Sequence, residues 1–596
     1  MAIEYLDGIR LYRSITAGLK RVVSRQDYLN HINVYPIPDS DTGTNMACTL
    51  LSIEDGIQES VHSNVHRMSM AIADSALDGA RGNSGAILAQ FFVGFADALQ
   101  DLSTINTVQF AQAIEKARNY AYEALVHPQE GTILTVMSDW VKKIRHFSEK
   151  VADFRSLTAI ALEQAQVSLQ ETPQKLEVLA KAGVVDAGAQ GFVDMLEGIQ
   201  DYINDGTLTP ASFARSLEQT QAAIAATEKF RYCTECIITG TAIRHRPLQE
   251  RLISCGNSLV LAGTKTKAKV HIHTNDPKSV FTICQEFGQV TAEKADDMIQ
   301  QQRDARQEDG SIAVIVDSGC DLPEDILEKL NIHVIPVRLN FGNAHYVDKV
   351  TLTNEEFWQE VATNPVHPKT SQPTPGDFRR QYQFLSTHYQ AAVSIHLPAN
   401  LSGTLQSALA ASRILSDFPI QILDSRNGSV GMGLIAMRTA EAIRAGKDLD
   451  KVAQITHQAI TNTKIYIGLD TLDYVVKGGR VSPSVKKIAD LLRINPILTF
   501  SDGGVTSIGK TYGRRKKINK FKSFVAQHLP SDKPFRVGLA HTKAVTAARE
   551  WEAELVEQLG QDKVILTEIG PALGVHAGPG ALVAAIQILE DDLADE

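Results

Sequence analysis

The sequence predicts a multidomain protein with an all-α N-terminal domain, a small α+β middle domain and an α/β C-terminal domain. With 596 residues, the chain is longer than a single hydrophobic core usually grows. Apolar residues recur at helical spacing up to about residue 205, as in Ile87, Phe91 and Phe95. After residue 311, β-type runs alternate with helical stretches. These observations set the expected order of the domains.

The composition is typical of a soluble globular protein and argues against nucleic acid as a partner. Hydrophobic residues make up 43 % of the chain, and the formal net charge is -10. Nucleic-acid binding needs a surplus of lysine and arginine, which occurs only locally at residues 514–517. No signal peptide and no run of about 18 apolar residues is visible, so a cytoplasmic protein without a transmembrane segment is expected. The six cysteines have no framework spacing.

The N-terminal domain, residues 1–205, contains a loop that could hold divalent cations. Residues 39–46 read DSDTGTNM and place Asp39 and Asp41 two residues apart in a turn that leads into a helix. Mg²⁺ prefers hard oxygen ligands, and Asn33 could be a further ligand. The alternative is an ordinary helix cap.

Three more polar loops that contain glycine lie between the predicted helices. GNSG, which includes Ser84 and Gly85, precedes an amphipathic helix, so free N–H groups and the helix dipole could meet a phosphate there. EGT ends at Thr132, and DAGAQG begins at Asp186. Any one of these loops alone is a weak signal.

Together, NVYPIPDSDTGTNM, GARGNSG, EGTILTV and AGVVDAGAQG resemble the ATP-binding domain of the dihydroxyacetone kinase family, in the form found in fatty acid kinases. The resemblance covers residues 1–205 and implies a barrel of helices that binds ATP and two Mg²⁺ ions at one end. It assigns the metals to Asp39 and Asp41. The resemblance also implies that residues of the glycine-containing loops and the adjacent helix start bind the nucleotide. These residues are Asn45, Ser84, Gly85, Thr132 and Asp186.

The middle domain, residues 206–305, has short β-type runs and a candidate zinc site. In KVHIHT, His271 and His273 lie two residues apart, so both imidazoles project from one face of a strand. Cys233 could complete a set of ligands for Zn²⁺, with Cys236 or Glu235 as extras. The alternative is two ordinary strand histidines. RYCTEC and KVHIHTNDP resemble the middle domain of fatty acid kinases, which carries a metal at matching positions; a structural Zn²⁺ away from the chemistry is expected.

The C-terminal domain follows a polar linker at residues 300–310 and spans residues 311–596. VDSGCDLP, KTSQPTPGDF, LSGTLQSA, KGGRVSP and IGPALGVHAGPGAL resemble the DegV fatty-acid-binding family. The resemblance implies two α/β lobes around an apolar tunnel that holds a fatty acid. A buried carboxylate needs donors. The candidates are Thr370, Ser371, Ser402 and His576, each of which could instead be an ordinary turn or cap residue.

Two further patterns in this domain have competing interpretations. Arg480 could bind the acyl ligand, and with the basic residues 514–517 it could steer an acidic partner domain; a solvated basic edge is the alternative. GVTSIGKT at residues 504–511 satisfies the phosphate-loop pattern. We reject that interpretation, because a hairpin turn precedes the segment and no helix start follows it.

The combined resemblance implies a fatty acid kinase that forms acyl phosphate from ATP and a fatty acid. Asp39 and Asp41 would act with the metals, and His576 would hold the carboxylate and stabilise developing charge. A homodimer and a transient membrane-surface contact for lipid exchange are also expected. The rival functions are a nucleotide-gated lipid-binding regulatory protein and a kinase of dihydroxyacetone or a polyol.

Overall fold

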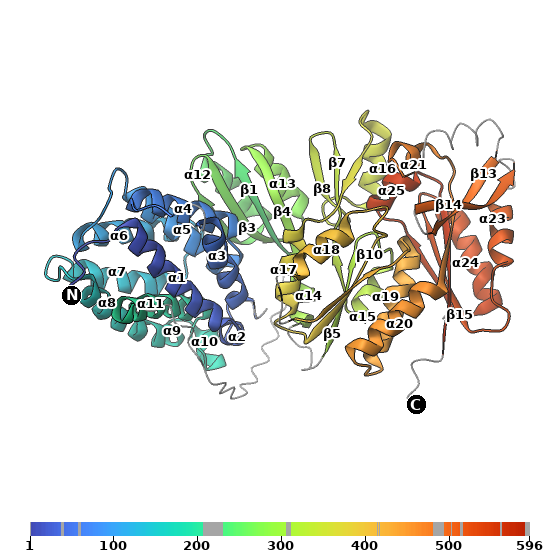
Figure 1. Ribbon diagram of the computed structural model, residues 1–596. Helices are drawn as coiled ribbons and strands as arrows, with labels where there is room; N and C mark the ends of the chain where they lie inside the picture. Colours follow the sequence, from blue (N-terminus) through green and yellow to red (C-terminus); the bar gives the residue numbers. More distant parts are fainter. Residues whose placement is uncertain are drawn as a thin grey trace. The chain divides into compact units, whose positions relative to one another are not determined.

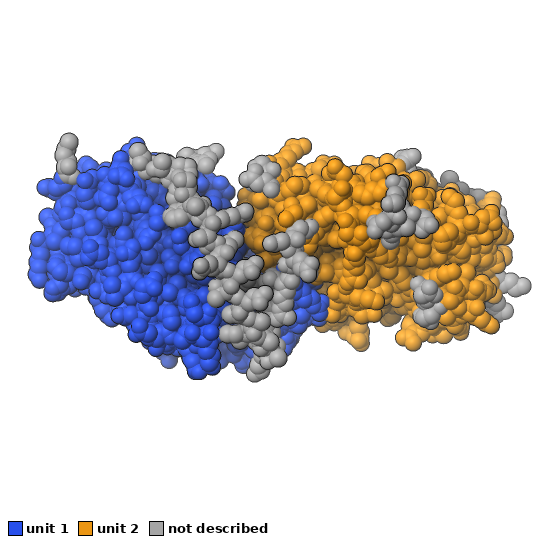
Figure 2. Space-filling model, turned by 90° about the horizontal axis from the view of Figure 1, so that it is seen from below, with its two compact units in different colours: residues 1–306 blue, residues 307–596 orange. Residues whose placement is uncertain are grey.

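The structure is a computed structural model with two compact units, Met1–Arg306 and Gln307–Glu596, which Figure 2 colours separately. Each unit is described by itself. The described residues are 2–36, 38, 41–57, 61–206, 230–304, 311–413, 415, 418–480, 494–501, 504–512, 517–560 and 563–590.

The N-terminal part of the first unit is a closed ring of helices (Figure 1). Its helices are α1 (Gly8–Ser24), α2 (Gln26–His31), α3 (Thr42–Ile57), α4 (Val65–Gly79), α5 (Gly82–Ala98), α6 (Thr107–Glu123), α7 (Ile133–Phe147), α8 (Phe154–Gln170), α9 (Thr172–Lys175), α10 (Glu177–Ala182) and α11 (Ala187–Asp205). Each of α1, α4, α5, α6, α7, α8 and α11 packs against the next, and α11 returns to α1. The predicted all-α barrel is confirmed.

The sequence explains both where these helices begin and which faces they bury. Asn106 and Gln109 form a capping box at the start of α6, which satisfies backbone donors that have no partner within the helix. In the core, the rings of Phe91, Trp140 and Phe192 lie 5.7–6.5 Å apart, two of the three pairs edge to face. These aromatic residues come from α5, α7 and α11, so they join distant parts of the ring.

The middle domain is an antiparallel sheet in the order β2-β3-β1-β4, covered by helices on one face. Its elements are β1 (Tyr232–Thr239), α12 (His245–Leu252), η1 (Ile253–Cys255), β2 (Gly256–Gly263), β3 (Lys267–Thr274), α13 (Pro277–Gln285), β4 (Gln289–Asp297) and α14 (Met298–Asp304). Cys236, Val270 and Ile272 join Leu248 of α12 and Phe281 of α13 in one core. The predicted α+β class is confirmed.

The opposite face of this sheet lies against the helical part of the same unit. Strands β2 and β3 contact α5, and β3 also contacts α4. The Leu261 N–H donates to the carbonyl of Ala124 at 2.9 Å, and the Gly263 N–H donates to Gln90 Oε1 at 2.6 Å. Successive residues of a strand point to opposite faces, so every second residue of β1 and β3 is directed at the helices.

The second unit contains two larger sheets and a small one. A parallel sheet has the order β11-β10-β5-β6, a mixed sheet β14-β13-β12-β17-β15-β16, and an antiparallel sheet β8-β7-β9. The strands are β5 (Ile312–Asp317), β6 (Ile332–Ile335), β7 (Arg338–Phe341), β8 (Ala344–Val347), β9 (Lys369–Ser371), β10 (Ala391–His396), β11 (Ile420–Asp424), β12 (Thr463–Gly468), β13 (Ile494–Ser501), β14 (Gly504–Tyr512), β15 (Phe535–His541), β16 (Val564–Glu568) and β17 (Leu582–Ile588).

Helices surround and link these sheets. They are α15 (Glu324–Leu330), α16 (Asn354–Thr363), α17 (Pro375–Leu385), α18 (Thr404–Ser412), α19 (Ser429–Arg444), α20 (Leu449–Asn462), α21 (Asp473–Lys477), α23 (Lys517–Ala526), α24 (Val545–Leu559) and α25 (Pro571–Ala577). Helix α19 packs on β5 and β10 of the parallel sheet and on β12, β15 and β17 of the mixed sheet. It therefore joins two α/β lobes, as predicted.

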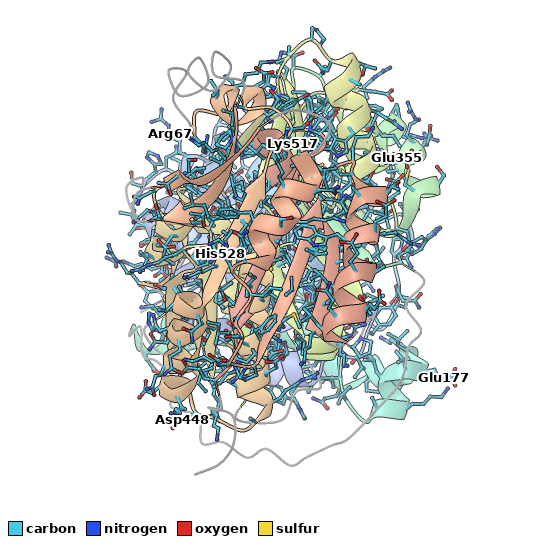
Figure 3. The ribbon with its side chains drawn as sticks, turned by 90° about the vertical axis from the view of Figure 1, so that its right-hand side faces the viewer. Arg67, Glu177, Glu355, Asp448, Lys517 and His528 are labelled. Carbon is cyan, nitrogen blue, oxygen red and sulfur yellow. The ribbon has the colours of Figure 1, made fainter. Side chains whose placement is uncertain are left out.

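Residues 504–511, which match the phosphate-loop pattern, lie in strand β14 and pair with β13. A phosphate loop must lead into a helix N-terminus, so the rejection of that motif is confirmed. Lys517, which is labelled in Figure 3, lies at the start of α23 and donates to Asp470 at 3.1 Å. The other three basic residues of the cluster at 514–517 lie outside the described residues.

A buried row of polar side chains resembles a catalytic triad but has another role. His396 lies between Asp317, at 3.2 Å, and Ser394, at 2.7 Å, and the Tyr382 hydroxyl bonds to Ser394 at 2.9 Å. All four residues are fully buried. A nucleophile needs access to substrate, so this row stabilises the parallel sheet by satisfying its own polar groups.

Candidate functional site

A polar pocket in the first unit is lined by both the helical part and the middle domain. From the helices come Asn33, Asp41, Thr42, Asn45, Gly82, Asn83 and Ser84, and from the middle domain come Cys233, His271, His273, Met298 and Gln301. The two sites predicted from the sequence are thus one site. From the sequence we expected a metal at Cys233 and the two histidines to lie away from the chemistry. In the structure, these three residues line the same pocket as Asp41.

The starts of α3 and α5 line this pocket, and the start of α11 lies against that of α5. A Cβ atom on Gly82 would lie 2.5 Å from Asn45 Nδ2, which places the start of α5 against α3. A Cβ atom on Gly188 would lie 2.7 Å from Ser84 Oγ, which places the start of α11 against α5. Because helix N-termini carry unpaired N–H groups and positive partial charge, their convergence suits an anion such as a phosphate.

Asp186 and Thr132 support this arrangement from behind. Asp186 Oδ1 accepts the Ala189 N–H at 2.8 Å and the Ile133 N–H at 3.0 Å, so one carboxylate fixes the starts of α11 and α7. Burial raises the pKa of Asp186 to about 6, although these two bonds oppose the rise. The Thr132 hydroxyl donates to the Gln129 carbonyl at 2.7 Å. Neither residue lines the pocket.

Of the remaining residues predicted to bind the nucleotide, some line the pocket and others do not. Asn45 and Ser84 line the pocket, whereas Gly85 is buried against α3, where a Cβ atom would lie 2.3 Å from Thr49 Oγ1. Asp39 lies outside the described residues. The Asn83 amide oxygen is buried and has no hydrogen-bond partner among the described residues. The carboxylate of Asp41 and the nearby amide oxygens are the hard donors that Mg²⁺ prefers, so the pocket fits this ion.

Cys233, His271 and His273 form a compact set of metal ligands on one face of the middle-domain sheet. In the pairing of β1 with β3, Cys233 is opposite His273. One ligand atom from each of the three residues lies within 4.8 Å of the others. His271 Nε2 and His273 Nδ1 are buried, and neither has a partner among the described residues. The three side chains therefore fit Zn²⁺ and leave a fourth position open.

The protonation of this trio depends on burial. Burial, followed by the nearby His271, lowers the pKa of His273 to about 3, so its imidazole is neutral at pH 7, as a metal ligand must be. Burial, followed by the negative charge of Glu235, raises the pKa of the Cys233 thiol. Cys236, named as an extra ligand from the sequence, lies in the apolar core on the other face. That part of the prediction is wrong because neighbouring strand residues point to opposite faces.

Glu235, the other extra ligand named from the sequence, contacts both a histidine of the trio and the start of α5. It is 2 % exposed, and its Oε1 lies 3.0 Å from His271 Nδ1 and 3.1 Å from the backbone nitrogen of Gly82. Its Oε2 pairs with Lys269 at 3.3 Å. Sequence reasoning missed Lys269, although its position two residues before His271 in the same strand puts both on one face.

The second unit encloses a cavity of about 360 Å³. Most of its wall is apolar and comes from the mixed sheet, including Ile465, Ile467, Leu498, Phe500 and Val583. The predicted ligand-binding residues all line it, and sequence reasoning missed three further polar residues of the lining. The predicted residues are Thr370, Ser371, Ser402, Arg480 and His576, and the missed ones are Gln372, Asn400 and Ser429.

Contacts among these polar residues place them at one end of the cavity. Thr370 Oγ1 lies 3.3 Å from His576 Nε2. Arg480 donates to the carbonyl oxygens of Leu401, at 3.1 Å, and Gly478. Ser402 Oγ accepts the N–H of Thr404 at the start of α18, so it also acts as a cap. An apolar cavity with hydroxyl, imidazole and guanidinium groups at one end suits an amphipathic ligand with an anionic head.

His576 is held in place and kept neutral by its surroundings. Burial, followed by the charges of Arg480 and His367, lowers its pKa to about 4. Its helix, α25, is fixed at the other end by two buried carboxylates. Asp321 accepts the Gly570 N–H at 2.9 Å, and Asp348 accepts the Ala572 N–H at 3.1 Å. The imidazole is thus a neutral group with a defined position.

These features define a multidomain protein whose first unit has a polar pocket lined by helix starts, a cysteine and two histidines, and whose second unit has a largely apolar cavity with polar groups at one end. Three family models match successive parts of the chain: the DAK2 domain at residues 36–201, the middle domain of FakA-like fatty acid kinase proteins at 229–305, and the uncharacterised DegV family at 311–590. The chain therefore combines a DAK2 domain, a FakA-like middle domain and a DegV domain.

Relatives and solved structures match parts of the chain. Protein YloV of Bacillus subtilis is 33 % identical over 315 residues, or 50 % of this chain and 57 % of the relative. An uncharacterised protein of Staphylococcus saprophyticus is 32 % identical over 326 residues, or 52 % of this chain and 59 % of the relative. The matches thus cover a little over half the length of these curated relatives.

Among solved structures, DegV of Bacillus subtilis, described as a fatty acid binding protein, is 28 % identical with a TM-score of 0.44, and the match covers 47 % of this chain and 100 % of that one. A DegV family protein from Thermus thermophilus, also described by fatty acid binding, is 27 % identical with the same TM-score and the same coverage. No described helix of this chain is long and apolar enough to cross a membrane.

Proposed function

We propose that the chain is a fatty acid kinase, which transfers the γ-phosphoryl group of ATP to a fatty acid carboxylate. The observation that carries this proposal is that one chain has both a polar pocket, lined by helix starts, Asp41 and the Cys233 trio, and an apolar cavity with a polar end. A kinase of dihydroxyacetone or a polyol has no use for such a cavity. The match to a FakA-like middle domain also supports the proposal.

In this proposal, the first unit binds the nucleotide through its helix N-termini. The N–H groups at the starts of α3 and α5 and the Ser84 hydroxyl would bind phosphate oxygens, and Asp41 with the neighbouring asparagines would hold Mg²⁺. Bound Mg²⁺ neutralises phosphate charge and makes the γ-phosphorus more electrophilic. Cys233, His271 and His273 would hold Zn²⁺ at the same pocket.

The second unit would hold the acceptor. The acyl chain fills the apolar cavity, and the carboxylate binds the hydroxyls of Thr370 and Ser402 and the imidazole of His576. Because His576 is neutral, it can donate one hydrogen bond without neutralising the nucleophile. The carboxylate oxygen forms a bond to the γ-phosphorus, the bond from that phosphorus to the bridging oxygen of ADP breaks, and ADP leaves with that oxygen.

Trapping the product tests this function directly. The protein is incubated with Mg-ATP and oleate, and acyl phosphate is converted by hydroxylamine to a hydroxamate that can be quantified. We expect hydroxamate that depends on both ATP and oleate. If none forms although ATP and oleate both bind, the kinase proposal fails and a nucleotide-gated lipid-binding protein is favoured. Phosphorylation of dihydroxyacetone in its place would favour the polyol-type kinase. Dimerisation and membrane-surface contact remain predictions.

A further inference from the structure

Glu235 touches both halves of the pocket in the first unit. It lies on β1 of the middle domain, and its Oε1 accepts the backbone N–H of Gly82, the first residue of α5, at 3.1 Å. The same oxygen lies 3.0 Å from His271 Nδ1, which belongs to the candidate metal trio. One carboxylate oxygen thus joins the phosphate-binding loop to a metal ligand.

The contact with Gly82 gives α5 a cap that its own sequence does not supply. Arg81, the N-cap residue, makes no side-chain capping bond. A negative charge at a helix N-terminus is stabilising, and Glu235 provides one from another part of the fold. Gly82 has a φ of 56°, and a Cβ atom there would lie 2.5 Å from Asn45. The loop that Glu235 holds is therefore closely fitted to α3.

The contact with His271 fixes which ring nitrogen can bind a metal. A carboxylate only accepts hydrogen bonds, so Nδ1 of His271 carries the proton and Nε2 keeps its lone pair. Nε2 is buried and has no partner among the described residues. A carboxylate behind a histidine ligand both orients the ring and makes it a stronger donor.

Two lysines hold the other oxygen of Glu235. Oε2 lies 3.3 Å from Lys269 Nζ and 3.9 Å from Lys294 Nζ, and both ammonium groups are largely buried. The carboxylate therefore cannot rotate without losing contacts on both oxygens.

We propose that Glu235 is a positioning residue that couples metal binding at Cys233, His271 and His273 to nucleotide binding at the start of α5. A metal held by the trio would fix the His271 ring and, through it, Glu235 and Gly82 in one arrangement. A phosphate at the α5 N-terminus selects the same arrangement from the other side. This inference rests on the proposed function only in that the pocket binds a nucleotide.

Such coupling is reciprocal, and this gives it a test that needs no turnover. If Zn²⁺ raises the affinity for a nucleotide by some factor, the nucleotide must raise the affinity for the metal by the same factor. We expect about fivefold or more in the wild-type protein. Replacement of Glu235 by glutamine should bring this factor to about one and weaken metal binding by about 10- to 100-fold, as for other carboxylates behind histidine ligands.

The experiment uses the full chain and two probes. A fluorescent N-methylanthraniloyl-ADP with Mg²⁺ is titrated into protein that has been freed of zinc or loaded with one equivalent of it. Co²⁺ is then titrated with and without the nucleotide and followed through the absorption of its thiolate complex. Glu293→Gln is the matched control, because Glu293 is also a buried glutamate of this sheet but lies on β4, not on β1 or β3, which carry the trio.

Coupling in the wild type and in Glu293→Gln that disappears in Glu235→Gln supports the proposal. Equal nucleotide affinity with and without metal in the wild type overturns it, whether or not any variant folds. Wild-type coupling in a folded Glu235→Gln overturns it as well. If Glu235→Gln does not fold, Glu235→Asp keeps the charge but shortens the reach, and it should still reduce the coupling factor. Hydroxamate formation without coupling would contradict this inference but not the kinase proposal. Coupling without hydroxamate formation would contradict the kinase proposal but not this inference.

Discussion

The absence of a side chain on Gly478 makes room for the imidazole of His576. A Cβ atom on this glycine would lie 2.1 Å from His576 Nδ1, far inside van der Waals contact. Arg480, two residues later, lines the same cavity and donates to the Gly478 carbonyl. Gly478, the first glycine of KGGR, thus leaves the space that the His576 ring occupies at the polar end of the cavity.

Replacing Gly478 by alanine should therefore displace His576 and weaken fatty acid binding. Loss of a hydrogen bond to a charged group costs about 1.5–3 kcal/mol, so we expect the Kd for a fluorescent fatty acid to rise roughly tenfold or more. Gly376→Ala is the control, since a Cβ atom there meets nothing closer than 3.5 Å. Equal affinities of both variants and the wild type would contradict this role of Gly478.

Acid should destabilise the second unit through His576. The pKa of this residue falls from 6.5 to about 4 on folding. Between these values the unfolded chain binds more protons than the folded one, so stability rises with pH across this window and is reduced below it. This difference in pKa corresponds to a loss of about 3 kcal/mol in the free energy of unfolding as the pH falls across the whole window. Between pH 7 and pH 5 the loss is about 2 kcal/mol.

Denaturant unfolding at pH 7 and pH 5 checks this sign. The wild type should lose about 2 kcal/mol more than His576→Gln on going to pH 5. His457→Gln, at an exposed position of α20, should behave like the wild type. A wild type and a His576→Gln variant that respond equally to acid would show that His576 is not held neutral.

Asp41→Asn should abolish turnover and leave lipid binding intact. The amide keeps the size of the side chain but removes a negative charge from the set of oxygen ligands. Loss of metal assistance is worth several kcal/mol, so we expect hydroxamate formation to fall by at least about a hundredfold. Oleate affinity should be unchanged. Asp74→Asn, at an exposed position of α4, should keep wild-type activity; wild-type turnover in Asp41→Asn would remove Asp41 from the mechanism.

The purified protein should contain about one zinc ion per chain, bound by the trio. Metal analysis after dialysis should find a stoichiometric amount in the wild type and in Cys255→Ala, and much less in Cys233→Ala. Cys255 is a suitable control because its thiol contacts only the Arg251 carbonyl at 3.8 Å among the hydrogen bonds of the described residues. Zinc that persists in Cys233→Ala would place the metal elsewhere.

Much of this architecture could be predicted from the sequence. The apolar positions Ile87, Phe91 and Phe95 of α5 are all buried, because a helical period of apolar residues fixes a buried stripe. Residues 504–511 form a strand in spite of their phosphate-loop pattern, as the preceding turn indicated. In the second unit, every predicted ligand-binding residue lines one cavity.

The composite pocket could not be predicted, since it depends on how the middle-domain sheet docks on the helices. Local spacing placed His271 and His273 on one strand face but did not show that Asp41 lines the same pocket. Asp186 and Thr132 were assigned to the nucleotide because their loops resemble those of the dihydroxyacetone kinase family. The structure uses those groups to fix helix starts, which no sequence pattern separates from ligand binding.

Both faces of the middle-domain sheet are packed against other elements, and this determines where the chain can be divided into folded pieces. One face of the sheet completes a core with α12 and α13, and the other supplies the cap of α5 and covers Ala86 and Ala124 through Val260. A fragment that ended before β1 would leave that apolar patch in water and α5 without its carboxylate. A separately expressed first unit should therefore extend to about residue 306, so that it includes both the helical part and the middle domain.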